Sequence, residues 1–114
     1  MDRIGKLAFA VVLSVGSFSV FAVQNDRICI QRGIMGQAFA DLKASGNPEK
    51  EAIRVAGFAR DQNIKEDPSP KSKRSQEDTY KKNVRIIEYL YTVNLKSEDA
   101  REMVYLKCKA GDFD

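Results

Sequence analysis

The sequence predicts an all-α protein, a small four-helix array that follows a cleaved signal peptide and is closed by one disulfide bond. Three observations carry this prediction. Apolar residues recur at helical spacing in four segments, and no stretch shows the alternation typical of a strand. An uncharged apolar run precedes these segments. The only two cysteines, Cys29 and Cys108, lie near the two ends of the helical region.

Residues 1–22 are predicted to be a secretory signal peptide. A short basic start is followed by an apolar run, and Val20 and Ala22 fit the −3 and −1 positions of a signal-peptidase site. An uncleaved membrane anchor is the alternative, because the run approaches the ~20 apolar residues that span a bilayer. Serines and a glycine within the run favour cleavage. Residues 23–114 would then form one domain, periplasmic or secreted.

The first helix is predicted over about residues 26–45 and the second from Pro48, a favoured first helical residue, to about Asn63. Apolar residues of the first helix form a stripe about 140° wide that is expected to face the core. The stripe consists of Ile28, Ile34, Met35, Ala38, Phe39 and Leu42. Gly33 and Gly36 weaken this helix, but they present a small surface that would permit close approach of a neighbouring helix.

Residues 65–76 are predicted to be a mobile surface loop, because they contain two prolines and no apolar residue. A third helix is predicted over about residues 77–93, where apolar residues recur at helical spacing. Ser97 is a suitable cap for a fourth helix, which Gly111 would end.

Cys29 and Cys108 are predicted to form a disulfide, since an exported protein passes through an oxidising compartment. Successive helices in an up-and-down array alternate in direction, so the start of the first and the end of the fourth lie at the same end. In the chain-entropy model, closing a loop of roughly 80 residues contributes about 4.5 kcal/mol. The bond would therefore compensate for a small core.

Short segments near both cysteines carry a resemblance. They are Phe39–Lys43 after Cys29, Ile86–Tyr91, Ser97–Ala100 and Tyr105–Cys108. These segments resemble a family of small exported proteins of Gram-negative bacteria whose function is uncharacterised. The resemblance implies export, helices and a disulfide between the two ends. It implies no activity and no catalytic residues, and the loop predicted at residues 65–76 has no counterpart in it.

No catalytic, cofactor or metal site is predicted. The chain has no histidine, which is the usual general base and a common metal ligand, and both cysteines are assigned to the disulfide. No glycine-rich phosphate or dinucleotide motif is present. The remaining groups that a hydrolase could use are pairs of adjacent acidic residues. Exposure to solvent in a loop and favourable positions at helix N-termini explain these pairs better. These pairs are Glu66-Asp67, Glu77-Asp78 and Glu98-Asp99.

The expected function is non-catalytic binding of another macromolecule. The candidate partner-binding residues are an aromatic residue expected off the core stripe and a basic cluster, namely Tyr89, Lys71, Lys73 and Arg74. They favour another protein or an anionic envelope component as partner. The balance of 19 basic and 16 acidic residues argues against nucleic acid. An immunity or inhibitor protein is one form of this hypothesis, and a periplasmic stress chaperone is the alternative.

Overall fold

The computed structural model describes residues 16–114, with side chains described from Asn25 onwards. This part contains four helices and no strand, so the all-α prediction is confirmed. The helices are α2 (Gly16–Ala44), α3 (Glu49–Glu66), α4 (Pro70–Leu90) and α5 (Ser97–Lys109). None of the described helices is both long and apolar enough to span a membrane.

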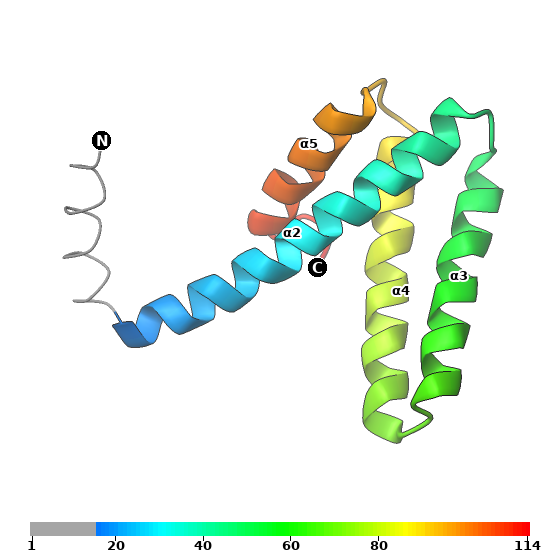
Figure 1. Cartoon of the computed structure of the whole chain (residues 1–114). Helices are drawn as coiled ribbons and strands as arrows, with labels where there is room; N and C mark the ends of the chain where they lie inside the picture. Colours follow the sequence, from blue (N-terminus) through cyan, green and yellow to red (C-terminus); the bar gives the residue numbers. More distant parts are fainter. Residues whose placement is uncertain (1–15) are drawn as a thin grey trace, which may run out of the picture.

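The helices are arranged as two pairs (Figure 1). One pair is the antiparallel hairpin of α3 and α4, and the other is α2 with α5, which runs beside it in the opposite direction (Figure 1). The long α2 crosses the hairpin obliquely, so the array is not a regular bundle of four aligned helices. The core lies where the two pairs meet, and its largest fully buried side chains include Phe39, Ile86, Ile87 and Val104.

The start of the fold differs from its predicted position. α2 begins at Gly16, which precedes both the predicted helix start near Asp26 and the predicted cleavage site after Ala22. Most of the predicted signal peptide, residues 1–15, lies outside the described part of the chain. Export therefore stays a prediction.

The prediction of a mobile loop over residues 65–76 is wrong for most of its length. α4 already begins at Pro70, and only Asp67–Ser69 join it to α3. The side chain of Ser69 caps α4 by accepting a hydrogen bond of 3.2 Å from the backbone N–H of Ser72. Proline at the first helical position loses no hydrogen bond there, so this proline starts a helix rather than preventing one.

The predicted core stripe of the first helix is only partly right. Phe39 is buried and Met35 and Leu42 pack against the core, but other members of the stripe face outwards. Those members are Ile28, which is 48% exposed, Ile34, which is 46% exposed, and Ala38. The face that α2 presents to α5 is instead made of small residues. They are Cys29, Gly33, Gly36 and Ala40.

Gly33 and Gly36 allow α2 and α5 to approach closely, as their small surface predicted. A Cβ atom on Gly33 would lie 2.8 Å from the backbone oxygen of Arg101. A Cβ atom on Gly36 would lie 2.7 Å from Cγ2 of Val104, whose side chain is fully buried. Both distances are too short for an ordinary contact, so a larger residue at either position would force the neighbouring atoms of α5 to shift.

We expect Gly36→Ala to lower the free energy of unfolding by about 1 kcal/mol, because an overpacking cost of about 1–3 kcal/mol exceeds the gain in helix propensity. Gly57→Ala in α3 is the matched control, since its added Cβ would meet nothing closer than 3.6 Å. That variant should be stabilised by up to about 1 kcal/mol. Urea unfolding measures both changes, and equal stabilisation of the two variants would contradict the close approach.

The residues after α5 return to the core. The chain turns at Gly111, whose φ of 81° favours glycine, and Phe113 then packs with only 6% of its surface exposed. The ring centroid of Phe113 lies 6.2 Å from that of Tyr89, and Nη1 of Arg85 donates a hydrogen bond of 2.8 Å to the Phe113 carbonyl oxygen. The last residues of the chain therefore cover one side of α4.

Candidate functional site

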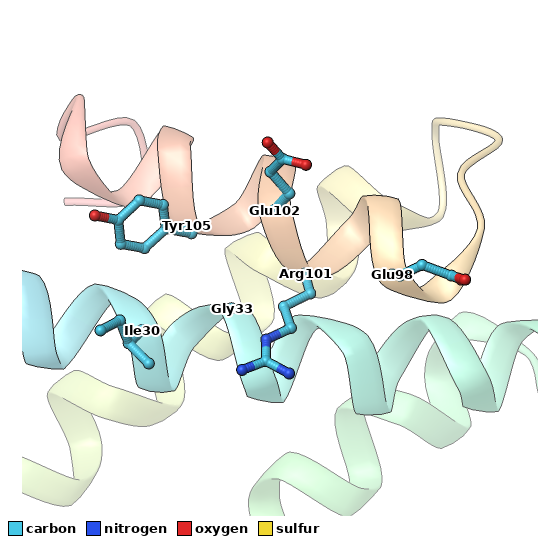
Figure 2. Close-up of a pocket in the computed structure, with 6 residues that line it drawn as sticks. All are labelled: Ile30, Gly33, Glu98, Arg101, Glu102 and Tyr105. Atoms are coloured by element: carbon cyan, nitrogen blue, oxygen red, sulfur yellow. The ribbon is translucent and has the colours of Figure 1, made fainter. Parts of the chain in front are cut away.

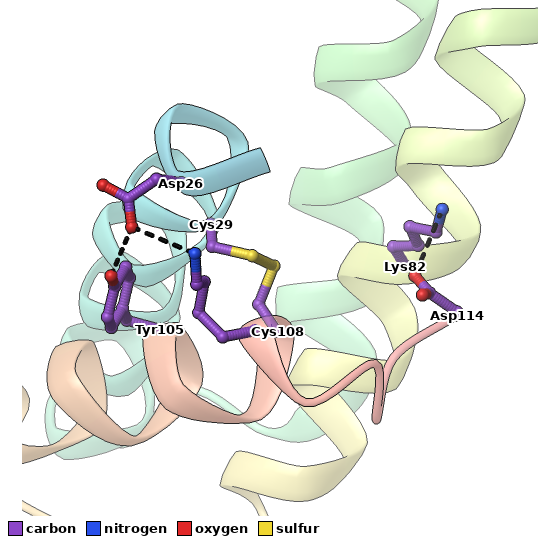
Figure 3. The surroundings of a disulfide bond; sticks show 7 residues. Asp26, Cys29, Lys82, Tyr105, Cys108 and Asp114 are labelled. Carbon is purple, nitrogen blue, oxygen red and sulfur yellow. Dashed lines mark hydrogen bonds and ion pairs between the residues drawn. A yellow bond between two sulfur atoms is a disulfide. The ribbon is translucent and has the colours of Figure 1, made fainter. Parts of the chain in front are cut away.

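The disulfide between Cys29 and Cys108 joins α2 to the last turns of α5 (Figure 3). The sulfur atoms lie 2.02 Å apart and the Cα atoms 5.4 Å apart, which is within the usual range for a disulfide. The predicted pairing is confirmed, although Cys29 lies inside α2 rather than near its start. The bond fixes the position of α5 along α2.

A polar cluster lies beside the disulfide. The Tyr105 hydroxyl donates a hydrogen bond to the Asp26 carboxylate, and the Lys109 ammonium lies 3.3 Å from the same oxygen (Figure 3). The hydrogen bond from Tyr105, helped by Lys109, holds the pKa of Asp26 below its ordinary value. The same hydrogen bond raises the pKa of Tyr105. Ionised Asp26 thus gives α2 a second attachment to α5.

The lowered pKa predicts how this attachment depends on pH. The stability that ionised Asp26 contributes to the fold is fully present above its ordinary pKa of 3.8. This stability is lost as the pH falls through the lower pKa that Asp26 has in the folded protein. We therefore expect Asp26→Asn to lower the melting temperature near neutral pH, and we expect its difference from the parent to shrink as the pH falls below the ordinary pKa of 3.8. Thermal melts across this range measure the difference, with exposed Glu102→Gln in the middle of α5 as control. A difference in melting temperature that does not change with pH would contradict the role assigned to Asp26.

A shallow groove of about 330 Å³ lies between α2 and α5, close to this cluster (Figure 2). Its lining residues are Ile30, Gly33, Glu98, Arg101, Glu102 and Tyr105. In Figure 2 the Arg101 side chain extends from α5 across to α2 near Gly33, while the carboxylate of Glu102 points away from α2. The groove is therefore open to the surface, with an apolar floor and charged edges.

Two isoleucines extend the apolar surface of the groove along α2. Ile30, which lines the groove, is 43% exposed, and Ile34, one turn further along the helix, is 46% exposed. They remain outside because the small residues of α2 occupy the positions that face α5. Neighbouring exposed apolar side chains of this kind are typical of binding surfaces.

The groove was not predicted from the sequence, although a signal for it was present. Small residues recur at Cys29, Gly33, Gly36 and Ala40, which is the spacing of one helical face. Taking that face as the contact side of α2 would have placed Ile30 and Ile34 outside. The larger apolar residues of the wider stripe instead predict a different face of α2 as its contact side.

The predicted partner-binding residues lie elsewhere, at opposite ends of α4. Tyr89 is half-buried near the end of α4, beside Phe113 and under the Lys107 ammonium, which lies 4.9 Å from its ring centre. The basic residues lie exposed on the first turns of α4 at the free end of the hairpin (Figure 1). They are Lys71, Lys73 and Arg74. The structure thus does not bring Tyr89 and the basic cluster together.

The acidic pairs are exposed at the end of α3, on α4 and in the first turn of α5. Across residues 16–114, no three histidine, cysteine, aspartate or glutamate side chains are placed to hold a metal ion. The fold and the groove define a small helical protein in which a disulfide fixes the two walls of an open surface groove. Comparison with protein-family models, characterised proteins and solved structures finds no match to this chain.

Proposed function

We propose that this chain is a small exported protein that binds another protein in the groove between α2 and α5 and performs no catalysis. An immunity or inhibitor protein of the cell envelope is the form that we favour. The observation that carries the proposal is the exposure of Ile30 and Ile34 beside a groove whose walls are joined by a disulfide. A groove with fixed walls loses little conformational freedom on binding, which favours affinity.

The charges at the groove indicate the chemistry of the partner. Glu98 and Glu102 lie at its edge on α5, and exposed Asp99 lies beside Glu98. Arg101 is the one cation among the lining residues. A complementary partner would insert an apolar side chain between α2 and α5 and place lysine or arginine against the glutamates. The proposed partner segment is therefore apolar with basic flanks.

The proposal is tested by capture and by mapping the contact. The oxidised protein is used to retain proteins from a periplasmic extract, first unmodified and then with both Ile30→Glu and Ile34→Glu. We expect a specific partner that the parent retains and the double variant loses, because buried glutamates in the interface would be unpaired. A photocrosslinking residue at position 34 should attach to the same partner.

Ile28→Glu is the matched control. Ile28 lies on the same helix and is 48% exposed, but it does not line the groove. Its variant should retain the partner. The proposal fails if no specific partner is found, or if a partner is retained equally by the parent and the double variant.

The chaperone hypothesis remains as a second candidate, favoured by apolar exposure outside the groove. Phe58 on α3 is 60% exposed, and Leu106 on α5 is 50% exposed. A chaperone would use such surfaces for many unfolded clients rather than for one partner. Assays of client aggregation over a range of pH separate the two functions, and inactivity at every pH would eliminate the chaperone.

A further inference from the structure

The outer face of α3 carries a large exposed aromatic ring. Phe58 lies on this face with 60% of its surface exposed, and it is the one aromatic residue among the large exposed apolar side chains from Asn25 onwards. Figure 1 shows α3 at the edge of the array, beside α4. An aromatic ring is the kind of side chain that most often anchors a contact between proteins.

A shallow hollow of about 500 Å³ lies directly beside Phe58. It forms because Gly57 has no side chain, so the surface is low between Ile53 on α3 and Tyr80 on α4. A Cβ atom added to Gly57 would meet nothing closer than Cε1 of Tyr80, at 3.6 Å. The floor of the hollow is therefore apolar and aromatic, which suits a phenylalanine ring. The chain thus presents a protruding ring and a hollow side by side.

Two opposite charges lie on the same face of α3. Arg54 lies one turn before Phe58, Asp61 lies one turn after it, and both are exposed. Arg54 uses Nε and Nη2 for its hydrogen bonds to Glu51, and Asp61 uses Oδ1 for its bond from Nε of Arg60. Nη1 of Arg54 and Oδ2 of Asp61 can therefore each form one further ion pair.

We propose that two copies of this chain associate through antiparallel α3 helices, with each Phe58 ring in the hollow over Gly57 of the other copy. Such a dimer has a two-fold axis, which lies between Gly57 and Phe58. The axis places each residue opposite the one that is equally far from it on the second copy. Arg54 of each copy therefore faces Asp61 of the other. One contact buries both rings and adds two ion pairs.

The charges favour the antiparallel arrangement over a parallel one. In a parallel pair, Arg54 would face Arg54 and Asp61 would face Asp61, and like charges in an interface repel. Farther from the axis of the antiparallel pair, Lys50 would face Lys65, but helices that cross at an angle are separated there. A contact between single helices is small for a protein interface, so the dimer is reversible and its population depends on concentration.

The face of α3 shares no lining residue with the groove between α2 and α5. The inference therefore does not depend on the proposed function, and the groove stays open in the dimer. It does bear on the chaperone hypothesis, because the dimer would cover Phe58, one of the exposed apolar residues that favour a chaperone.

Sedimentation velocity of the oxidised protein over a range of concentrations tests the proposal. We expect the parent to shift from monomer to dimer as its concentration rises. Phe58→Ser should weaken the dimer at least about 10-fold, because the central anchor is lost on both copies. Gly57→Gln should also weaken it, because the new side chain occupies the hollow, and it should stay folded since glutamine favours a helix more than glycine does. Leu106→Ser on α5 is the matched control, since Leu106 is 50% exposed, and it should leave the dimer unchanged.

Charge reversal tests the antiparallel arrangement. Arg54→Glu and Asp61→Arg should each weaken the dimer at least about 10-fold, because like charges then face each other at two places. The variant that carries both changes should dimerise as the parent does, since the opposite charges have only exchanged positions. In a parallel pair, like charges would face each other in the parent and in all three variants, so reversal would have little effect.

Four outcomes would overturn the inference. If the parent stays monomeric at millimolar concentration, the ring of Phe58 is not covered by a second copy. If Phe58→Ser dimerises as the parent does, the contact lies elsewhere. If the doubly reversed variant stays monomeric while folded, the helices are not antiparallel. If Ile30→Glu together with Ile34→Glu abolishes the dimer, the second copy occupies the groove between α2 and α5 instead.

Discussion

Replacing both Cys29 and Cys108 with serine is expected to lower the free energy of unfolding by about 4–5 kcal/mol. The reason is the length of the closed loop, because the two cysteines are 79 positions apart in the sequence. Without the bond, the unfolded chain gains the freedom that this closure removes. Since small domains are stable by only about 5–15 kcal/mol, the variant should be close to its unfolding threshold at 37 °C.

Denaturant unfolding with and without reductant measures this effect. The parent under reducing conditions should match the double-serine variant, and the variant itself should not respond to reductant. Replacing both cysteines avoids a free thiol that could form bonds between molecules. If the parent unfolds at the same denaturant concentration in both conditions, the disulfide does not provide the expected stability.

Phe113→Ala is expected to lower the free energy of unfolding by about 3 kcal/mol, near the lower end for a buried phenylalanine because a terminal segment can relax. The ring is 6% exposed and packs against Tyr89, so its loss would leave a cavity beside α4. It would also release the segment whose carbonyl oxygen accepts the hydrogen bond from Arg85. Thermal and urea unfolding both report the change.

Two further variants provide reference values for the effect of Phe113→Ala on stability. Phe113→Leu should cost less than about 1.5 kcal/mol, because it keeps most of the apolar volume. Phe58→Ala removes the same side chain at a position that is 60% exposed and should change stability by about 0.5 kcal/mol or less. If Phe113→Ala behaves like Phe58→Ala, the segment after α5 is not docked in solution.

Patterns along single helices predicted much of the fold. The apolar spacing after Ser97 predicted the fourth helix, which is α5. Ser97 is not its cap as predicted, because it is the first helical residue and its hydroxyl donates a hydrogen bond to Asp41. The disulfide followed from the cysteine count and the helix number, and the structure contains it. The pattern at residues 65–76 predicts a loop because proline breaks helices, but Pro70 occupies the first helical position, where proline starts a helix.

The groove depends on which face of α2 meets α5, and local periodicity does not determine that choice. Ile34 and Phe39 both belonged to the predicted core stripe, but only Phe39 is buried. The deciding contact is between residues distant in sequence, since Gly36 packs on Val104. Phe113 was missed for a related reason, because an apolar residue outside any helix carries no periodic signal.

The short turn at Asp67–Ser69 also bears on the order in which the molecule assembles. α3 and α4 are adjacent in sequence, so their pairing closes only a small loop and should be fast. The pairing of α2 with α5 joins the two most distant helices and carries the largest entropic cost of closure. We therefore expect the hairpin to form first and α5 to pack along α2 later. Oxidation of the two thiols would then come late in assembly, after the packing of α5 on α2 has brought Cys29 and Cys108 together.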